Sequence, residues 1–294
     1  RVDQVPYEEV RAKQIADSIG AKRYDIINPC TEWCYEYRTF ATPLNEWIGR
    51  PGYPDLEVED IIPFVWQGFN PDEEIWWLPY QPDTRIFFYR DDLLKAEGLE
   101  VPRTWDELLY VAERLTKDTD GDGVVDQFGF GFPGMRGWNL TLAWVPLMFA
   151  AGGEMWDENL QPVFNGPAGV EALEFMLELK KFAPPDVTNY GEYELIQAAM
   201  NGTVAMGISA TSITPEIEAA NSPVKGLIKS AMFPIKSEDI DRKYNAILGG
   251  WAFGVSSYST KKDAAAYVAM WLASKDISNE MEMNGRLHPA RASA

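Results

Sequence analysis

The acidic segment DTDGDGVVDQFG, residues 118–129, has the residue types and spacing of a calcium-binding loop. Oxygen ligands recur at alternate positions, and a glycine stands where such a loop must turn sharply. The candidate ligands are Asp118, Asp120, Asp122, Val124 and Asp126. Position twelve is Gly129 where a calcium loop carries a bidentate Glu, so one strong ligand pair is missing. Two interpretations stay open: a structural calcium site, and a metal-free acidic turn that caps the preceding helix. We expect no other cofactor to be required.

Aromatic residues are the second group whose types could contribute to a functional site. The chain has 11 Trp, 13 Tyr and 14 Phe. The Trp residues near Gly, Pro, Asn or turn-like sequence are Trp33, Trp76, Trp77, Trp138, Trp144 and Trp251. Pyranose rings present apolar C–H faces that pack flat on indole, while Asp, Glu, Asn and Arg groups pair with their hydroxyls. The alternative is that each Trp is partly buried core. Adjacent strand residues point to opposite faces, so at most one of Trp76 and Trp77 faces a cleft, and we favour Trp77.

Catalytic signatures are scarce. The single histidine, His288, stands before Pro289 near the end of the sequence, which excludes histidine triads and multi-histidine metal sites. The sequence also contains no Walker loop, no G-x-G-x-x-G that opens a helix and no G-x-S-x-G elbow. A glycosidase stays open as an alternative, because it needs only two carboxylates about 5 to 9 Å apart.

Charge and cysteine content restrict the partners. The chain has 45 acidic and 26 basic residues, a net charge of -19, which would repel nucleic acid and anionic membrane surfaces. No apolar run approaches the length of a membrane span, and the longest, residues 142–151, is interrupted by Pro146. Cys30 and Cys34 are four residues apart, which suits neighbouring helix positions better than a disulfide. We favour two thiols, while a disulfide or a metal site stays open.

Strand and helix patterns alternate along the whole chain, which predicts an α/β fold. The expected strands are 24–27, 85–90, 204–209 and 252–257. The expected helices are 7–19, 104–118, one that starts at Pro167, and 263–274. Thr104 and Glu107 form a capping box at the start of the second helix. In the third, Val170, Leu173 and Leu177 share a face. At 294 residues, two lobes are a better expectation than one domain.

The order of these motifs resembles the carbohydrate-type extracellular solute-binding proteins of ABC importers, the family that includes maltose-binding protein. The longest matching stretch is WWLPYQPDTRIFFYRDDLLKAEGLEVPRTWDELL, residues 76–109, where the family's chain crosses between lobes. The other matching pieces, in order, are YDII, PLNEWI, DGDGVVDQFGF, AGGEMW, GTVAMGIS, LGGWAFGVSS and GRLHPARASA. The resemblance covers nearly the whole chain.

The resemblance implies a two-lobed fold with a hinge and a central ligand cleft, with lobe 1 at 1–83, lobe 2 at 84–249 and a return segment at 250–294. It implies ligand contacts at Glu32, Trp33, Asp83, Trp138, Asn139 and Trp251. This chain departs from the family pattern at one segment. Where some members place a stacking Trp, it has Ser209 to Ser212. The chain also resembles a family member cut at both ends.

The function implied by the resemblance is binding, not catalysis. We expect a monomer that takes a sugar or oligosaccharide and delivers it to an ABC transporter permease. We expect the protein to be extracytoplasmic, either periplasmic or a membrane-tethered lipoprotein. Two alternatives remain: a secreted carbohydrate-active enzyme, and a binding protein for a peptide, polyamine or metal chelate on the same fold.

Overall fold

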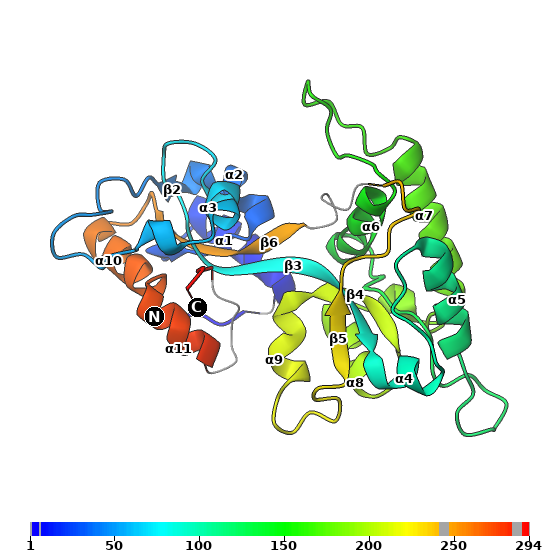
Figure 1. Cartoon of the computed structure of the whole chain (residues 1–294). Helices are drawn as coiled ribbons and strands as arrows, with labels where there is room; N and C mark the ends of the chain where they lie inside the picture. Colours follow the sequence, from blue (N-terminus) through cyan, green and yellow to red (C-terminus); the bar gives the residue numbers. More distant parts are fainter. Residues whose placement is uncertain (1, 6, 241–246, 284–289, 294) are drawn as a thin grey trace. The chain divides into compact units, whose positions relative to one another are not determined.

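The computed structural model describes residues 2–5, 7–240, 247–283 and 290–293 (Figure 1). The chain divides into two compact units: residues 1–83 and 248–294 form unit 1, and residues 84–247 form unit 2. The expected return to the first lobe at residue 250 lies two residues too late. Leu248 and Gly249 belong to unit 1 because they open strand β6 (Leu248–Ser256).

Strand β6 is the central strand of unit 1. Strands β1 (Ile26–Ile27) and β2 (Ala41–Thr42) pair antiparallel with it, so that Ile26 lies opposite Val255 and Ala41 opposite Ser256. The strand expected at 24–27 is therefore shorter than predicted, and the one expected at 252–257 begins earlier.

Helices surround these strands in unit 1. They are α1 (Tyr7–Ile19), α2 (Cys34–Tyr37), α3 (Pro63–Phe69), α10 (Lys262–Leu272) and α11 (Lys275–Met283), with 3-10 turns η1 (Thr31–Trp33), η2 (Arg38–Phe40) and η3 (Val58–Asp60). Helix α1 has the predicted bounds. Buried Arg291 joins the end of the described chain to this unit by donating to the carbonyl oxygens of Leu56 and Ala273 at 2.9 and 2.8 Å.

Strand β3 (Leu78–Arg90) starts in unit 1 and ends in unit 2. The strand order is β1-β6-β3-β4, and in unit 2 β3 also pairs with β5 (Ile228–Ala231). Strand β4 (Met206–Ala210) is antiparallel to β3, with Arg85 opposite Ala210 and Ile86 opposite Ser209. The strand expected at 85–90 is thus the second half of a longer one.

Helices pack around the strands of unit 2, with Phe87, Leu108, Phe130 and Met148 in its largest apolar cluster. They are α4 (Asp91–Ala96), α5 (Trp105–Leu115), α6 (Trp138–Ala150), α7 (Pro167–Leu179), α8 (Glu192–Met200) and α9 (Thr214–Ile217), with 3-10 turns η4 (Lys180–Phe182), η5 (Val187–Asn189) and η6 (Thr211–Ile213). Among the described residues, no helix is both long and apolar enough to span a membrane.

Helix α5 begins as the capping box predicts: the Glu107 amide donates to Thr104 Oγ1, and the Thr104 amide to Glu107 Oε2. Pro146, expected to interrupt its apolar run, lies inside the continuous helix α6. Burial of the neighbouring apolar side chains offsets the lost backbone hydrogen bond.

Helix α7 starts at Pro167 as expected, but its apolar stripe does not face the core. Val170, Leu173 and Leu177 are each about half exposed, with 51%, 51% and 58% of their surface accessible. The buried face carries Ala172 and Phe175 instead, because Phe175 stacks on Trp105 of α5 with ring centroids 4.0 Å apart.

Candidate functional site

The structure brings Glu32 and Asp83 of unit 1 together at Gly249. A Cβ placed on Gly249 would lie 3.9 Å from Glu32 Oε1 and 3.8 Å from Asp83 Cβ. Glu32 is exposed on turn η1, while Asp83 is half-buried on β3. Two acidic residues from distant parts of the chain therefore border one short stretch of backbone, and a carboxylate is an acceptor for hydroxyl groups.

Gly250 permits this arrangement because β6 approaches β3 closely there. Its φ is +128°, and a Cβ would lie 2.2 Å from the Gln81 carbonyl oxygen and 3.1 Å from the Asp83 amide nitrogen. Real Cβ atoms do not come so close, so a larger residue would force the two strands apart. Thr31 Oγ1 donates to the Gly250 carbonyl at 3.1 Å and so fixes η1 against the same point.

Trp33 and Trp251 form an aromatic corner beside these acids. Their ring centroids are 5.5 Å apart with an interplanar angle of 85°, an edge-to-face pair. Trp33 also lies nearly parallel to Tyr37, with centroids 6.2 Å apart. Both residues are half-buried. We define Glu32, Trp33, Asp83 and Trp251 as the unit 1 group.

The two cysteines are close neighbours of the unit 1 group. Cys30 pairs with Trp251 in an isolated antiparallel bridge, and Cys34 Sγ donates to the Cys30 carbonyl oxygen at 3.3 Å. Both are free and buried. Burial raises the pKa of each thiol well above its ordinary value, and the Glu32 carboxylate raises it further. The structure therefore favours the two-thiol interpretation.

Trp77 does not belong to the site. Its side chain is fully buried in the apolar core of unit 1, and the missing side chain of Gly254 makes room for its ring. The prediction that Trp77 contacts ligand is wrong, because its ring is fully buried where Gly254 leaves room for it. Asn70 fixes this orientation: its Oδ1 accepts from the amides of both Trp residues at 2.9 and 3.0 Å.

In unit 2, Trp138 and Asn139 are the first two residues of α6 and are half-buried. Asn139 lies next to Gly191: a Cβ on Gly191 would be 3.8 Å from Asn139 Nδ2. The indole N–H of Trp138 is buried without an acceptor among the described residues, a property it shares with core residue Trp105. It is therefore no sign of a ligand by itself.

A polar cluster beside Asn139 was missed by the sequence analysis. Arg85 of β3 donates from Nη1 to Glu192 Oε1, and Ser209 of β4 donates to Glu192 Oε2 at 2.9 Å. Glu192 directly follows Gly191 at the start of α8. Arg85 opens the strand expected at 85–90 and stands two residues after Asp83, a predicted ligand contact, and this proximity in the sequence was a usable signal. The partnership with Glu192 depends on tertiary structure and left no sequence signal.

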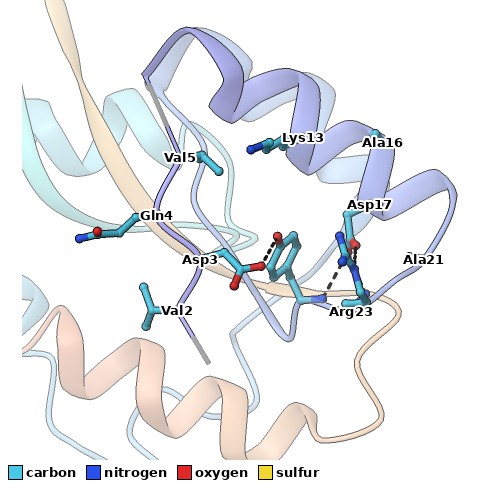
Figure 2. Close-up of a pocket in the computed structure, with 10 residues that line it drawn as sticks. Val2, Asp3, Gln4, Val5, Lys13, Ala16, Asp17, Ala21 and Arg23 are labelled. Atoms are coloured by element: carbon cyan, nitrogen blue, oxygen red, sulfur yellow. Dashed lines mark hydrogen bonds and ion pairs between the residues drawn. The ribbon is translucent and has the colours of Figure 1, made fainter.

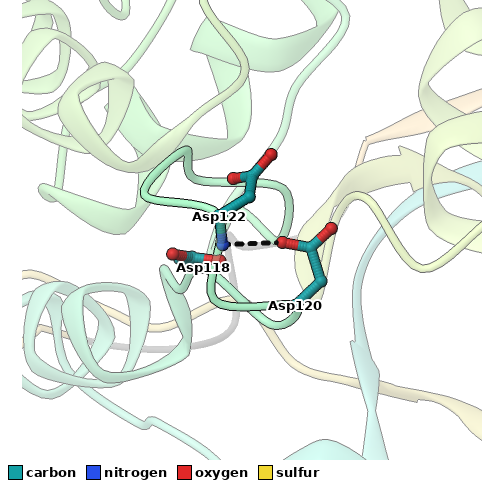
Figure 3. Close-up of side chains that lie close together, drawn as sticks. All are labelled: Asp118, Asp120 and Asp122. Atoms are coloured by element: carbon teal, nitrogen blue, oxygen red, sulfur yellow. Dashed lines mark hydrogen bonds between the residues drawn. The ribbon is translucent and has the colours of Figure 1, made fainter.

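The acidic loop of unit 2 gathers three of its predicted ligands. Carboxylate oxygens of Asp118, Asp120 and Asp122 lie within 4.8 Å of one another, and all three residues are exposed (Figure 3). Asp118 accepts from the amides of Gly123 and Gly121, each at 2.7 Å, which lowers the pKa of its carboxyl group.

The other two predicted ligands lie in the same loop. Asp126 accepts instead from the amide and the hydroxyl of Thr119, at 2.9 and 2.7 Å. Val124 is exposed, and its amide donates to Asp122 Oδ1 at 2.8 Å. The acids that would hold calcium thus also hold the turn.

A surface pocket near α1 contains none of the predicted ligand residues. It is lined by residues of the segment 2–5, of α1 and of the segment that follows α1, among them Asp3, Asp17, Arg23 and Tyr24 (Figure 2). Its acids are paired, because Tyr24 donates to Asp3 at 2.8 Å and Arg23 Nε to Asp17 at 2.7 Å. His288, the single histidine, lies outside the described residues.

Comparisons with known proteins identify a family whose model, described as bacterial extracellular solute-binding protein, matches residues 1–277. A probable amino-acid ABC transporter periplasmic-binding protein of Sinorhizobium fredii is 28% identical over 98% of this chain and 65% of its own length. A mannitol-binding protein of Pseudomonas aeruginosa is 29% identical over 75% of this chain and 50% of its own. The chain thus spans between half and two thirds of these two relatives.

Solved structures give the same picture of the fold. An ABC transporter solute-binding protein of Agrobacterium radiobacter in complex with ribitol superimposes with a TM-score of 0.86 and 26% identity, covering 97% of this chain and 71% of its own. Maltose-bound MalE3 of T. maritima has a TM-score of 0.82 and 25% identity, with 96% and 71% covered. The similarity to these solved structures confirms the predicted two-lobed α/β fold.

Proposed function

Because the chain belongs to the bacterial extracellular solute-binding protein family, we propose that it is the ligand-binding part of a receptor that serves an ABC importer. In this proposal its ligand is a neutral polyhydroxylated compound, a sugar or a polyol. The observation that carries the proposal is the unit 1 group, in which Glu32 and Asp83 border Gly249 and Trp33 packs edge to face on Trp251.

The chemistry of the unit 1 group suits such a ligand. Carboxylates accept hydrogen bonds from hydroxyl groups, and indole faces pack against C–H surfaces. Trp33 and Trp251 supply indoles at a right angle, so a compact ligand can pack on one ring and meet the edge of the other. The ribitol and maltose complexes of the similar structures support this ligand class. The relative named for amino acids makes an amino acid the competing ligand.

Binding would be linked to motion at the two chain crossings, between Asp83 and Thr84 and between Ile247 and Leu248. Asp83 belongs to the ligand group and is also the last residue of unit 1 before the first crossing. A ligand that hydrogen-bonds Asp83 can therefore favour one hinge conformation over another. We propose that this conformation docks on a membrane permease, outside the cytoplasm, with the receptor as a monomer.

We also propose that the acidic loop of unit 2 takes calcium as a structural ion. Asp118, Asp120 and Asp122 supply the convergent oxygens. Gly129 in place of a bidentate Glu makes the site weak, so calcium would stabilise the loop without being required for ligand binding.

The experiment that tests the main proposal combines intrinsic Trp fluorescence with product analysis. The protein is titrated with ribitol, D-mannitol, maltose, a maltooligosaccharide, L-glutamate and L-leucine, and each mixture is then analysed by chromatography for cleavage products. A saturable fluorescence change with a polyol or sugar that is recovered intact supports the receptor. Cleavage of the oligosaccharide would support the glycosidase alternative, and saturation by an amino acid alone would overturn the ligand class.

A further inference from the structure

The cluster of Arg85, Glu192 and Ser209 in unit 2 holds a charged pair that packing alone does not require. The side chain of Arg85 is 10% exposed and that of Glu192 is 26% exposed, while Ser209 is fully buried. Withdrawing such a pair from water costs free energy, which one hydrogen-bonded contact repays only in part. A pair of this kind in the middle of strand β3, two residues after Asp83, therefore points to a role in recognition.

Arg85 has hydrogen-bonding capacity to spare. A guanidinium group carries five N–H donors in a planar fork. Within the described part of the chain, Arg85 has one acceptor, Glu192 Oε1. Glu192 itself is used on both oxygens, by Arg85 and by Ser209. The remaining donors of Arg85 are thus held in a fixed orientation by a carboxylate that is fixed in turn. Such a fork can donate to two oxygen atoms at once, as it does in its bidentate pairs with carboxylates and phosphates.

The position of the cluster links it to the ligand residues already described. Arg85 follows Asp83 by two positions on β3, and alternate residues of one strand point to the same side. On its other side, Glu192 follows Gly191, which borders Asn139. Within unit 2, the cluster therefore adjoins a predicted ligand contact at the start of α6.

The charge of the cluster indicates which oxygens it takes. Glu192 neutralises Arg85, so the fork offers hydrogen-bond donors without a net positive charge. The chain as a whole carries a net charge of -19, which further disfavours an anionic ligand. A carboxylate brought to Arg85 would also approach the carboxylate of Glu192, a repulsion that neutral hydroxyls avoid.

We propose that Arg85, oriented by Glu192, is a specificity-determining residue that binds two adjacent hydroxyl oxygens of a neutral polyol or sugar. In this role Glu192 is a positioning residue that also excludes the sugar acid with the same carbon skeleton. The inference rests on the proposed function and names the chemistry by which the site would select its ligand.

The test is calorimetric titration with three matched pairs of a neutral compound and its acid: ribitol and D-ribonate, D-mannitol and D-mannonate, maltose and maltobionate. We expect the wild-type protein to bind one neutral compound at least tenfold more tightly than its acid. Arg85→Gln should weaken binding of the neutral compound at least tenfold. Glu192→Gln should reduce the neutral-to-acid preference at least tenfold, because it leaves the positive charge of Arg85 uncompensated.

Arg90, the last residue of the same strand, and Asp92 of α4 form a matched control pair, with side-chain exposures of 11% and 36% and a separation of 2.7 Å. Arg90→Gln and Asp92→Asn should leave affinity and preference unchanged. Arg85→Lys, which keeps the charge but loses the fork, should also weaken binding and covers the case in which Arg85→Gln does not fold. Suppose that the wild-type protein binds one of the compounds and that the folded Arg85 and Glu192 variants keep its affinity and its neutral-to-acid preference. This result would overturn the inference about Arg85 and leave the proposed function standing. Failure of the wild-type protein to bind any of the six compounds would overturn the proposed function and the inference with it.

Discussion

The indole rings of Trp33 and Trp251 meet edge to face, with centroids 5.5 Å apart, although one lies near the beginning of the chain and the other near its end. Turn η1 and strand β6 hold them there through the Cys30–Trp251 bridge and the hydrogen bond from Thr31 to Gly250. The aromatic corner is therefore a product of the return of the chain to unit 1, and it stands beside Glu32 and Asp83.

Removing either ring of the corner should weaken ligand binding. We expect Trp33→Ala and Trp251→Ala each to raise the Kd at least tenfold, about 1.4 kcal/mol, because an indole that packs on the ligand is lost. Calorimetric titration measures this. Trp271→Ala is the control, since Trp271 is 48% exposed on α10 and outside the unit 1 group. Equal affinities for all three variants would remove the corner from the site.

Asp83→Asn tests the hydrogen-bonding part of the site while preserving side-chain shape. We expect at least a tenfold loss of affinity, because a charged acceptor for hydroxyl groups becomes a neutral amide. Asp106→Asn, on an exposed position of α5, serves as the control. If Asp83→Asn binds like the wild-type protein, Asp83 has a structural role at the crossing.

Gly250→Ala should destabilise unit 1 through a direct clash. The new Cβ would lie 2.2 Å from the Gln81 carbonyl oxygen, in addition to the strain of a φ of +128°. We expect a loss of about 2–4 kcal/mol, from overpacking of about 1–3 kcal/mol and backbone strain of about 1 kcal/mol. Gly226→Ala separates the two effects, because Gly226 has a φ of +72° but open space around it. It should cost only about 1 kcal/mol. Urea unfolding of both variants measures the difference, and equal losses would contradict the clash.

Local sequence signals predicted the elements well where a single segment determines them. Helix α1 and the capping box of α5 are examples, because propensity and capping act within a few residues. The sequence was insufficient where a distant partner decides. Trp77 turns inward because Gly254 leaves room for its ring. The apolar face of α7 that contains Val170 is exposed because the opposite face, with Phe175, packs on Trp105.

The candidate site shows the same division. Glu32, Trp33 and Asp83 were named from a motif resemblance, and the fold brings Glu32 and Asp83 to Gly249. Arg85 and Glu192 were missed because their pairing joins β3 to the start of α8. A pattern of spacing within one segment cannot report a contact between two elements that are far apart in the sequence.

The buried thiols of Cys30 and Cys34 should be unreactive in the native protein. Their pKa values are raised above the ordinary 9.0, first by burial and then by Glu32. Groups with a raised pKa contribute stability below the unfolded value, and that contribution is lost as pH rises above it. We therefore expect the unfolding free energy to fall above pH 9 by about 1.4 kcal/mol per pH unit for each thiol. A Cys30→Ala, Cys34→Ala double variant should lack this part of the slope. Rapid labelling of native protein with a thiol reagent at pH 8 would contradict the buried placement.

Calcium should raise the unfolding free energy of the protein by binding to the acidic loop. If the site is occupied at a hundred times its Kd, the unfolding free energy rises by about 2.7 kcal/mol. Thermal unfolding of chelator-treated protein with and without 10 mM calcium, on the order of 10–100 times the Kd of weak loops, measures the gain. An Asp118→Asn, Asp120→Asn variant should lose the gain, while magnesium should give less. No shift of the wild-type midpoint and no heat of binding at millimolar calcium would leave the metal-free turn as the correct interpretation.

The most direct test of the unit 1 group as the ligand site is a paired calorimetric titration of the wild-type protein and Asp83→Asn with the same neutral polyol or sugar. The wild-type protein is predicted to give a saturable isotherm with one ligand per chain, and the folded Asp83→Asn variant one at least tenfold weaker. Identical isotherms for the two proteins, or no binding of any polyol or sugar by folded wild-type protein, would contradict the central claim.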